Sequence, residues 1–185
     1  MKNALILHGT AGNSKENWFP WLKNELEKLG YLVWLPDLPH ADKPNPEMYN
    51  DFLLHQNFDF SAETILIGHS SGAVEILHLL PHLSVHIRAA FLVGAFKDND
   101  FLKWKPNDEL FSIPLDFAGI QKHYKKLVFI HSEDDPFCPL THASYLATKT
   151  GGELIIIPHQ KHFSVSTMGE KYREFPELLE RIIAI

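Results

Sequence analysis

The sequence predicts an α/β fold in which a mainly parallel sheet is covered by helices on both faces. Short apolar runs rich in branched residues alternate with helical patterns through most of the 185 residues, as strand–helix–strand units require. The runs show little polar alternation, which is typical of strands that are buried on both faces. Because crossovers between parallel strands are right-handed, we expect a doubly wound sheet.

Six apolar runs have the composition of strands, and polar or turn residues bound each of them. They are residues 4–7, 31–35, 64–67, 89–93, 127–130 and 154–157. We expect these six strands in the spatial order 2-1-3-4-5-6, counted along the chain. Functional side chains then gather at the carboxyl edge of the sheet.

Helical patterns fill most of the gaps between these runs. They cover residues 17–29, a stretch that begins after Ser70 and stops at Pro81, residues 141–150, and residues 170–183. Gly30 is a suitable C-terminal cap for the first helix, and Pro176 should interrupt the last one. Residues 36–57 and 96–121 fit neither pattern, so we expect loops or short helices there. The second of these segments is the candidate for a partial lid.

Composition and charge narrow the class of protein. A formal net charge of −6 gives no broad positive field, so we expect no nucleic-acid partner. Cys138 is the single cysteine, so no internal disulfide can form and a cytoplasmic location is expected. The apolar run at residues 4–7 is too short for a signal-peptide core, and we expect no membrane span. We predict one domain over residues 1–185, because no repeat or linker divides the chain.

The segment after the third run has the pattern G-x-S-x-G, formed by Gly68, His69, Ser70, Ser71 and Gly72. A strand leads directly into it and a helical pattern follows. The glycines permit a tight turn that exposes Ser70 at the end of the strand and at a helix N-terminus. This setting favours a nucleophile. The alternative is that Ser70 only caps the helix, which is the commonest use of serine at such a turn.

A serine hydroxyl needs a base that takes its proton and an acid that orients the base. Asp134 and Asp135 follow the fifth run, and His159 and His162 follow the sixth. Serine, acid and histidine thus occur in the chain order expected of α/β hydrolases, each at the carboxyl end of a strand. Either aspartate could instead cap the helix that follows it, and His159 could be an ordinary loop histidine.

The whole chain resembles the small, nearly lidless α/β hydrolases of the retinoblastoma-binding protein 9 and YdeN type. The resemblance rests on residues 67–72 (IGHSSG), residues 132–139 (SEDDPFCP) and the pair His162-Phe163. It implies an α/β-hydrolase fold with little or no lid. It also assigns the acid to Asp135, which directly precedes Pro-x-x-Pro, and the base to His162. The sequence departs from the pattern at Lys161, where such proteins have glycine, and it has an additional His159 nearby.

Negative charge on the attacked carbonyl oxygen needs donors that are already oriented. The backbone N–H groups of Thr10 and Ser71 are the candidates for this oxyanion hole: Ser71 follows the nucleophile, and Thr10 follows the first strand, where similar hydrolases place a donor. The expected activity is that of a carboxylesterase on small acyl esters, through an acyl-enzyme and without a cofactor. The alternatives are a thioesterase or peptidase, and a non-catalytic protein-binding module on a hydrolase scaffold.

Twelve histidines raise the question of a metal site. The pattern H-E-x-x-H is absent, and His159 with His162 lacks a third ligand at motif spacing, so we expect no metal. The loop at residues 9–12 carries neither nucleotide-binding glycine pattern. We expect Cys138 to pack in the core, and Trp104 is a candidate for lining a pocket.

Overall fold

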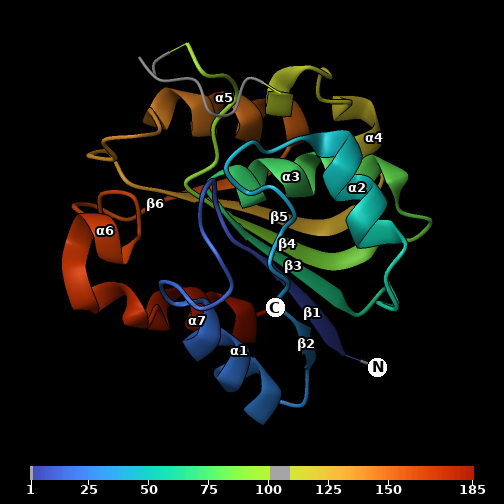
Figure 1. Cartoon of the computed structure of the whole chain (residues 1–185), viewed down its shortest axis with the longest axis horizontal. Coiled ribbons are helices and arrows are strands. Elements are labelled where there is room, and N and C mark those ends of the chain that lie inside the picture. Colours follow the sequence, from blue (N-terminus) through green and yellow to red (C-terminus); the bar gives the residue numbers. More distant parts are fainter. Residues whose placement is uncertain (1, 101–108) are drawn as a thin grey trace.

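The computed structural model describes residues 2–100 and 109–185. Six strands form one sheet in the order β2-β1-β3-β4-β5-β6, and every neighbouring pair is parallel, which confirms the predicted fold class and strand order (Figure 1). The strands are β1 (Asn3–Leu7), β2 (Leu32–Trp34), β3 (Thr64–His69), β4 (Ile87–Val93), β5 (Tyr124–His131) and β6 (Glu153–Ile156). Their carboxyl ends therefore meet at one edge of the sheet.

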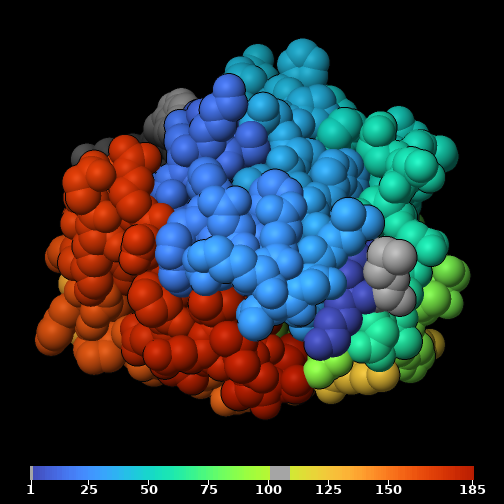
Figure 2. Space-filling view, turned by 90° about the horizontal axis from the view of Figure 1, so that it is seen from below, coloured from blue at the N-terminus to red at the C-terminus, as the bar shows by residue number. Residues whose placement is uncertain are grey.

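Helices cover both faces of this sheet. One face carries α1 (Phe19–Lys28) and α7 (Pro176–Ile183), which lie next to each other when the molecule is viewed from below (Figure 2). The other face carries α2 (Pro46–Leu54), α3 (Ser71–Leu79), α4 (Phe117–Gln121) and α5 (Leu140–Thr150). The shorter elements are α6 (Val165–Met168) and the 3-10 helices η1 (Leu80–His82), η2 (Glu109–Phe111) and η3 (Gly169–Arg173). Within the described part of the chain, no helix has both the length and the apolar character needed to cross a membrane.

Alternate strand residues supply two apolar cores. Ala4 and Ile6 of β1 pack with α1 and α7, whereas Leu5 and Leu7 pack with the helices on the other face. Burial on both faces explains why the strand sequences lack polar alternation. The prediction of buried runs is wrong for the two edge strands, since Leu32 of β2 is 61% exposed. β6 lies at the edge of the sheet, its residues are half-buried or exposed, and Ile156 is 49% exposed.

The helices differ from the predicted ones mainly at their ends. Leu29, the last residue of the predicted helix 17–29, is the C-terminal cap of α1 and is exposed. Pro176 divides the predicted helix 170–183 into η3 and α7. It occupies the first turn of α7, where the missing N–H would have no partner within the helix in any case.

The two irregular segments contain short helices, as predicted. Within residues 36–57, the Asn45 side chain accepts the N–H of Met48 and begins α2. Within residues 96–121 lie η2 and α4. Trp104, predicted as a candidate pocket residue, lies outside the described residues, as does the part of the candidate lid between Asp100 and Glu109.

Candidate active site

Ser70 lies at the junction of β3 and α3 with φ 56° and ψ −123°, a backbone conformation that L residues rarely adopt. The glycines of the motif make this turn possible. A Cβ at Gly68 would lie 2.5 Å from the carbonyl oxygen of Gly72, and a Cβ at Gly72 would lie 2.4 Å from that of His8. A side chain at Gly68 would clash with the backbone at the start of α3, and one at Gly72 would clash with the backbone at the end of β1. The pattern G-x-S-x-G is thus explained by close backbone packing.

Ser70 occupies the N-cap position of α3, but its side chain makes no capping hydrogen bond to the helix. The backbone N–H of Ser70 donates to the carbonyl of Val93 at 2.8 Å, which fixes the turn to the end of β4. A Cβ at Gly9 would lie 2.9 Å from the Cβ of Ser70 and 3.5 Å from its Oγ. Glycine at this position therefore lets the chain after β1 approach the hydroxyl closely.

Asp135 and His162 form a buried pair. Nδ1 of His162 lies 2.7 Å from Oδ2 of Asp135, and the side chains are 7% and 1% exposed respectively. The other oxygen, Oδ1, accepts the N–H groups of Phe137 at 2.8 Å and Cys138 at 3.0 Å. A carboxylate can only accept, so Nδ1 carries the proton of the neutral ring and Nε2 is left as the acceptor. This is the tautomer that a base requires.

Asp134 has different partners. Its Oδ1 accepts the hydroxyl of Ser132 at 2.7 Å and the N–H of Lys161 at 2.9 Å, and Oδ2 lies 3.2 Å from Nζ of Lys161. The Ser132 hydroxyl, followed by the donors of Lys161, lowers the pKa of Asp134 to about 2. His159 is exposed, with Nδ1 3.0 Å from Glu133. The structure therefore brings together Asp135 and His162. Asp134 and His159 instead form contacts at the surface between the loop after β5 and the loop after β6.

Two further residues contact the imidazole of His162 and were not singled out from the sequence. Gly94 follows β4 with φ 64°, and a Cβ there would lie 3.1 Å from Cε1 of His162. The ring of Phe137 meets the His162 ring edge-on, at 5.2 Å between centroids, and Phe137 is 45% exposed. A glycine directly after a strand is a weak signal, and only the position of Phe137 beside Asp135 could have indicated its role.

The candidate oxyanion residues lie in adjoining backbone segments. Oγ1 of Thr10 donates to Oγ of Ser71 at 2.9 Å, which joins the loop after β1 to the first residue of α3. The N–H groups of a first helical turn have no partner within the helix. His8 fixes the loop, because its Nε2 accepts the N–H of Leu38 and its Nδ1 donates to the carbonyl of Gly9, both at 2.9 Å. Burial lowers the pKa of His8, which favours this neutral ring.

One group of potential metal ligands occurs among the described residues. Atoms of Asp135, Cys138 and His162 all lie within 4.8 Å of one another. Asp135 and His162 are already hydrogen-bonded to each other, and burial raises the pKa of the Cys138 thiol well above its usual range. A metal would need the thiolate and would compete for the same lone pairs. The donor set thus fits a proton-relaying pair better than a metal centre.

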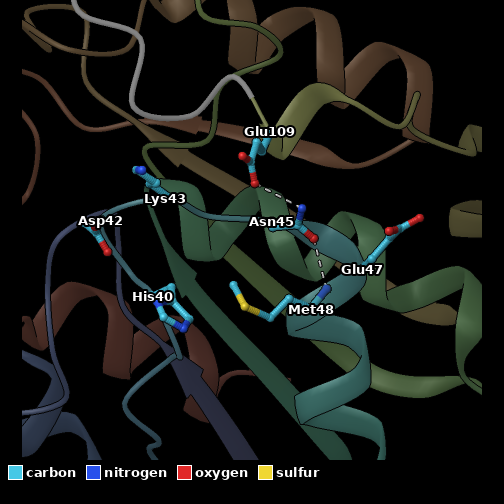
Figure 3. Close-up of a pocket in the computed structure, with 7 residues that line it drawn as sticks. All are labelled: His40, Asp42, Lys43, Asn45, Glu47, Met48 and Glu109. Atoms are coloured by element: carbon cyan, nitrogen blue, oxygen red, sulfur yellow. Dashed lines mark hydrogen bonds between the residues drawn. The ribbon is translucent and has the colours of Figure 1, made fainter.

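A polar pocket of about 420 Å³ lies beside the loop that precedes α2 (Figure 3). It is lined by that loop, by the first turn of α2 and by Glu109, which accepts a hydrogen bond from Asn45. The N–H of Ala11 donates to the carbonyl of Ala41 at 2.7 Å, so the pocket adjoins the loop that carries Thr10. The lining residues do not include the candidate nucleophile, acid or base.

Comparison with known proteins agrees with this geometry. The chain is 30% identical to "Putative hydrolase YdeN" of Bacillus subtilis over 166 residues, 88% of this chain and 86% of that protein. It is 24% identical to "Serine hydrolase RBBP9" of Rattus norvegicus over 179 residues, 95% of each chain. The crystal structure of the B. subtilis ydeN gene product superimposes with a TM-score of 0.90 at 26% identity, covering 100% of this chain and 98% of that one. The family model for serine hydrolases matches residues 4–181, and the chain belongs to the serine hydrolase family.

Proposed function

We propose that this serine hydrolase is a carboxylesterase for small acyl esters, with Ser70 as nucleophile, His162 as base and Asp135 as acid. The observation that carries the proposal is the buried 2.7 Å hydrogen bond from Nδ1 of His162 to Asp135, at the same sheet edge as the strained turn of Ser70. A base held in this tautomer by a desolvated carboxylate has no evident structural purpose other than proton transfer.

In the proposed first half-reaction, Oγ of Ser70 attacks the ester carbonyl while Nε2 of His162 takes its proton. The Asp135 carboxylate stabilises the imidazolium that forms, and the N–H groups of Thr10 and Ser71 hold the oxyanion. Collapse of the tetrahedral intermediate expels the alcohol, which receives the proton from His162. The acyl group is then bound to Ser70 as an ester.

In the second half-reaction, His162 takes a proton from water, and the resulting hydroxide attacks the acyl-enzyme carbonyl. Ser70 leaves and recovers its proton from His162, so the enzyme returns to its starting state. The proposed chemistry requires no cofactor. Small esters are the preferred class because a chain of 185 residues leaves little room for a lid over the site. Thioesters and amides would follow the same route.

The test is labelling with a fluorophosphonate probe, which reacts with an activated serine. We expect the wild type to be labelled, Ser70→Ala to lose labelling completely, and Ser112→Ala to keep it. Ser112 is an exposed serine directly after η2 and controls for the loss of a hydroxyl group. A wild type that is neither labelled nor able to turn over p-nitrophenyl acetate would contradict the proposal and favour the protein-binding module.

Location and domain organisation belong to the same proposal. We infer that residues 1–185 act as one catalytic domain in the cytoplasm. The sheet draws strands from both ends of the chain, and Cys138 is buried as a free thiol, which suits a reducing compartment. We expect no nucleic-acid partner, because the net charge is −6.

A further inference from the structure

His69, the residue before the candidate nucleophile, contacts the candidate base from the other side of the site. It is the last residue of β3, it is 5% exposed, and its Nε2 lies 2.8 Å from the backbone carbonyl oxygen of His162. We propose that His69 is a positioning residue that holds the main chain of His162 so that its imidazole faces Ser70. This inference rests on the proposed roles of Ser70 and His162.

The main chain around His162 needs such support, because it is strained. Lys161 and Phe163, on either side of it, both have φ 51°, in the left-handed region that favours glycine. Neither is glycine, so surrounding contacts must over-determine this conformation. A segment of this kind relaxes when its anchoring hydrogen bonds are removed.

Besides the bonds that join it to the loop after β5, such as that from the Lys161 N–H to Asp134, three hydrogen bonds from β3 and from the residues just before α1 anchor this segment. His69 donates to the carbonyl of His162 at 2.8 Å, and the indole N–H of Trp18 donates to the carbonyl of Phe163 at 3.0 Å. The side chain of Asn17 accepts the N–H of Val165 at 2.9 Å. Of these three anchors, His69 alone is covalently adjacent to Ser70. It therefore connects the nucleophile turn to the base through one side chain.

The chemical state of His69 suits this role. A carbonyl oxygen only accepts, so Nε2 of His69 carries the proton. The rings of His69 and His162 lie 4.7 Å apart between centroids, and a second cation there would oppose the imidazolium that forms during catalysis. Burial among Trp18 and Phe19, reinforced by the neighbouring His162, lowers the pKa of His69 to about 3. His69 thus stays neutral while His162 takes the proton.

A matched pair of variants tests the proposal. His69→Gln keeps an N–H donor near the position of Nε2, whereas His69→Leu fills a similar volume without a donor. We expect His69→Leu to lower kcat for p-nitrophenyl acetate about 10²-fold with little change in KM, since small displacements of a catalytic group have effects of this size. His69→Gln should recover most of the lost kcat. Circular dichroism spectra and thermal melts test whether both variants are folded.

A spectroscopic readout separates positioning from a general loss of packing. The downfield proton resonance of the His162 Nδ1–H, bonded to Asp135, should be retained in His69→Gln and shifted or lost in His69→Leu. The inference is overturned if folded His69→Leu keeps the wild-type kcat and the wild-type resonance. It is also overturned if the kcat of folded His69→Gln is as low as that of His69→Leu.

A measurement on the wild type alone covers the case in which His69→Leu does not fold. Nitrogen-15 NMR of the histidine side chains should place the His69 proton on Nε2, hydrogen-bonded to a carbonyl, at every pH where the protein is folded and active. A proton on Nδ1 overturns the inference. Failure of the proposed function is distinguishable, because it would appear as an unlabelled wild type in the fluorophosphonate experiment.

Discussion

Two buried carboxyl groups in this molecule have opposite surroundings. Asp135 follows β5, and both of its oxygens accept hydrogen bonds, from His162 on one side and from two backbone N–H groups on the other. Glu75 lies in the middle of α3, is completely buried, and has no hydrogen-bond partner for either oxygen among the described residues. Burial is therefore common to both groups, and the hydrogen-bond donors around Asp135 are what distinguish the proposed acid from Glu75.

The surroundings of the two carboxyl groups also have different energetic consequences. Burying a charged carboxylate without donors is costly, so the group keeps its proton instead. Burial raises the pKa of Glu75 well above its usual value, and its charge would in turn disfavour ionisation of the buried Tyr49 nearby. Asp135 is expected to contribute to turnover, whereas Glu75 is expected to lower stability. The predictions below separate these two effects.

The largest expected effect is that of Asp135→Asn. The amide can donate to Nδ1 of His162, which would place the proton on Nε2 and leave the ring unable to act as a base. Loss of the acid in comparable triads lowers kcat about 10⁴-fold. Steady-state turnover of p-nitrophenyl acetate measures it. Asp134→Asn is the control and should lose only a few-fold; equal losses would mean that Asp135 is not the acid.

Gly94→Ala should have the next largest effect. Its methyl group would lie 3.1 Å from Cε1 of His162 and displace the ring, so we expect kcat to fall about 10²-fold. Gly169→Ala is the matched control, because Gly169 also has a positive φ but has no atom within 4 Å of an added Cβ. Both should lose stability, by about 1–3 kcal/mol, as measured by urea unfolding. Equal kcat values in Gly94→Ala and Gly169→Ala would contradict the proposed role of His162 as the base.

Glu75→Gln should change stability and its pH dependence. The folded pKa of Glu75 lies above its unfolded value of about 4.5, so the stability of the wild type falls as pH rises from there to the folded pKa. The slope is at most about 1.4 kcal/mol per pH unit. Glutamine does not ionise, so the advantage of the variant should grow with pH in this window. Urea unfolding at several pH values measures this difference in the free energy of unfolding, and kcat should be unchanged. If the free energies of unfolding of the two proteins change in parallel with pH, the prediction is refuted.

The smallest expected effect is that of His159→Gln. His159 is 85% exposed, and its ion pair with Glu133 is of the surface kind that contributes about 0–1 kcal/mol. We expect kcat within about twofold of the wild type and a nearly unchanged melting temperature. A loss comparable to that of His162→Gln would make His159 the base.

Local patterns in the sequence predicted most of the fold. The apolar runs predicted all six strands, because branched residues bounded by turn residues leave a clear signal, and the expected order 2-1-3-4-5-6 is also the observed one. The glycines of G-x-S-x-G predicted the turn of Ser70, since each removes a clash with nearby backbone. The choice of Asp135 and His162 over their neighbours rested on the resemblance to a family, and the geometry of the hydrogen-bonded pair supports it.

The parts that the sequence did not predict depend on contacts between distant segments. Gly94 reaches His162 only because β4 lies between β3 and β5, and His69 reaches the carbonyl of His162 across 93 positions of the chain. The predicted strand order placed β2 and β6 at the sheet edges, but their apolar sequences did not reveal the exposure of Leu32 and Ile156. The burial of Glu75 was not predicted, because α3 is buried on all sides and helical periodicity therefore does not distinguish its buried positions from exposed ones.

The most direct test of the proposed mechanism is to trap the acyl-enzyme. Wild-type protein mixed with p-nitrophenyl acetate is quenched with acid within the first turnovers and examined by intact and peptide mass spectrometry. The mechanism predicts one added acetyl group, located on Ser70, and none in Ser70→Ala treated in the same way. Ester turnover without any acyl group on Ser70, or with the group on another residue, would contradict it.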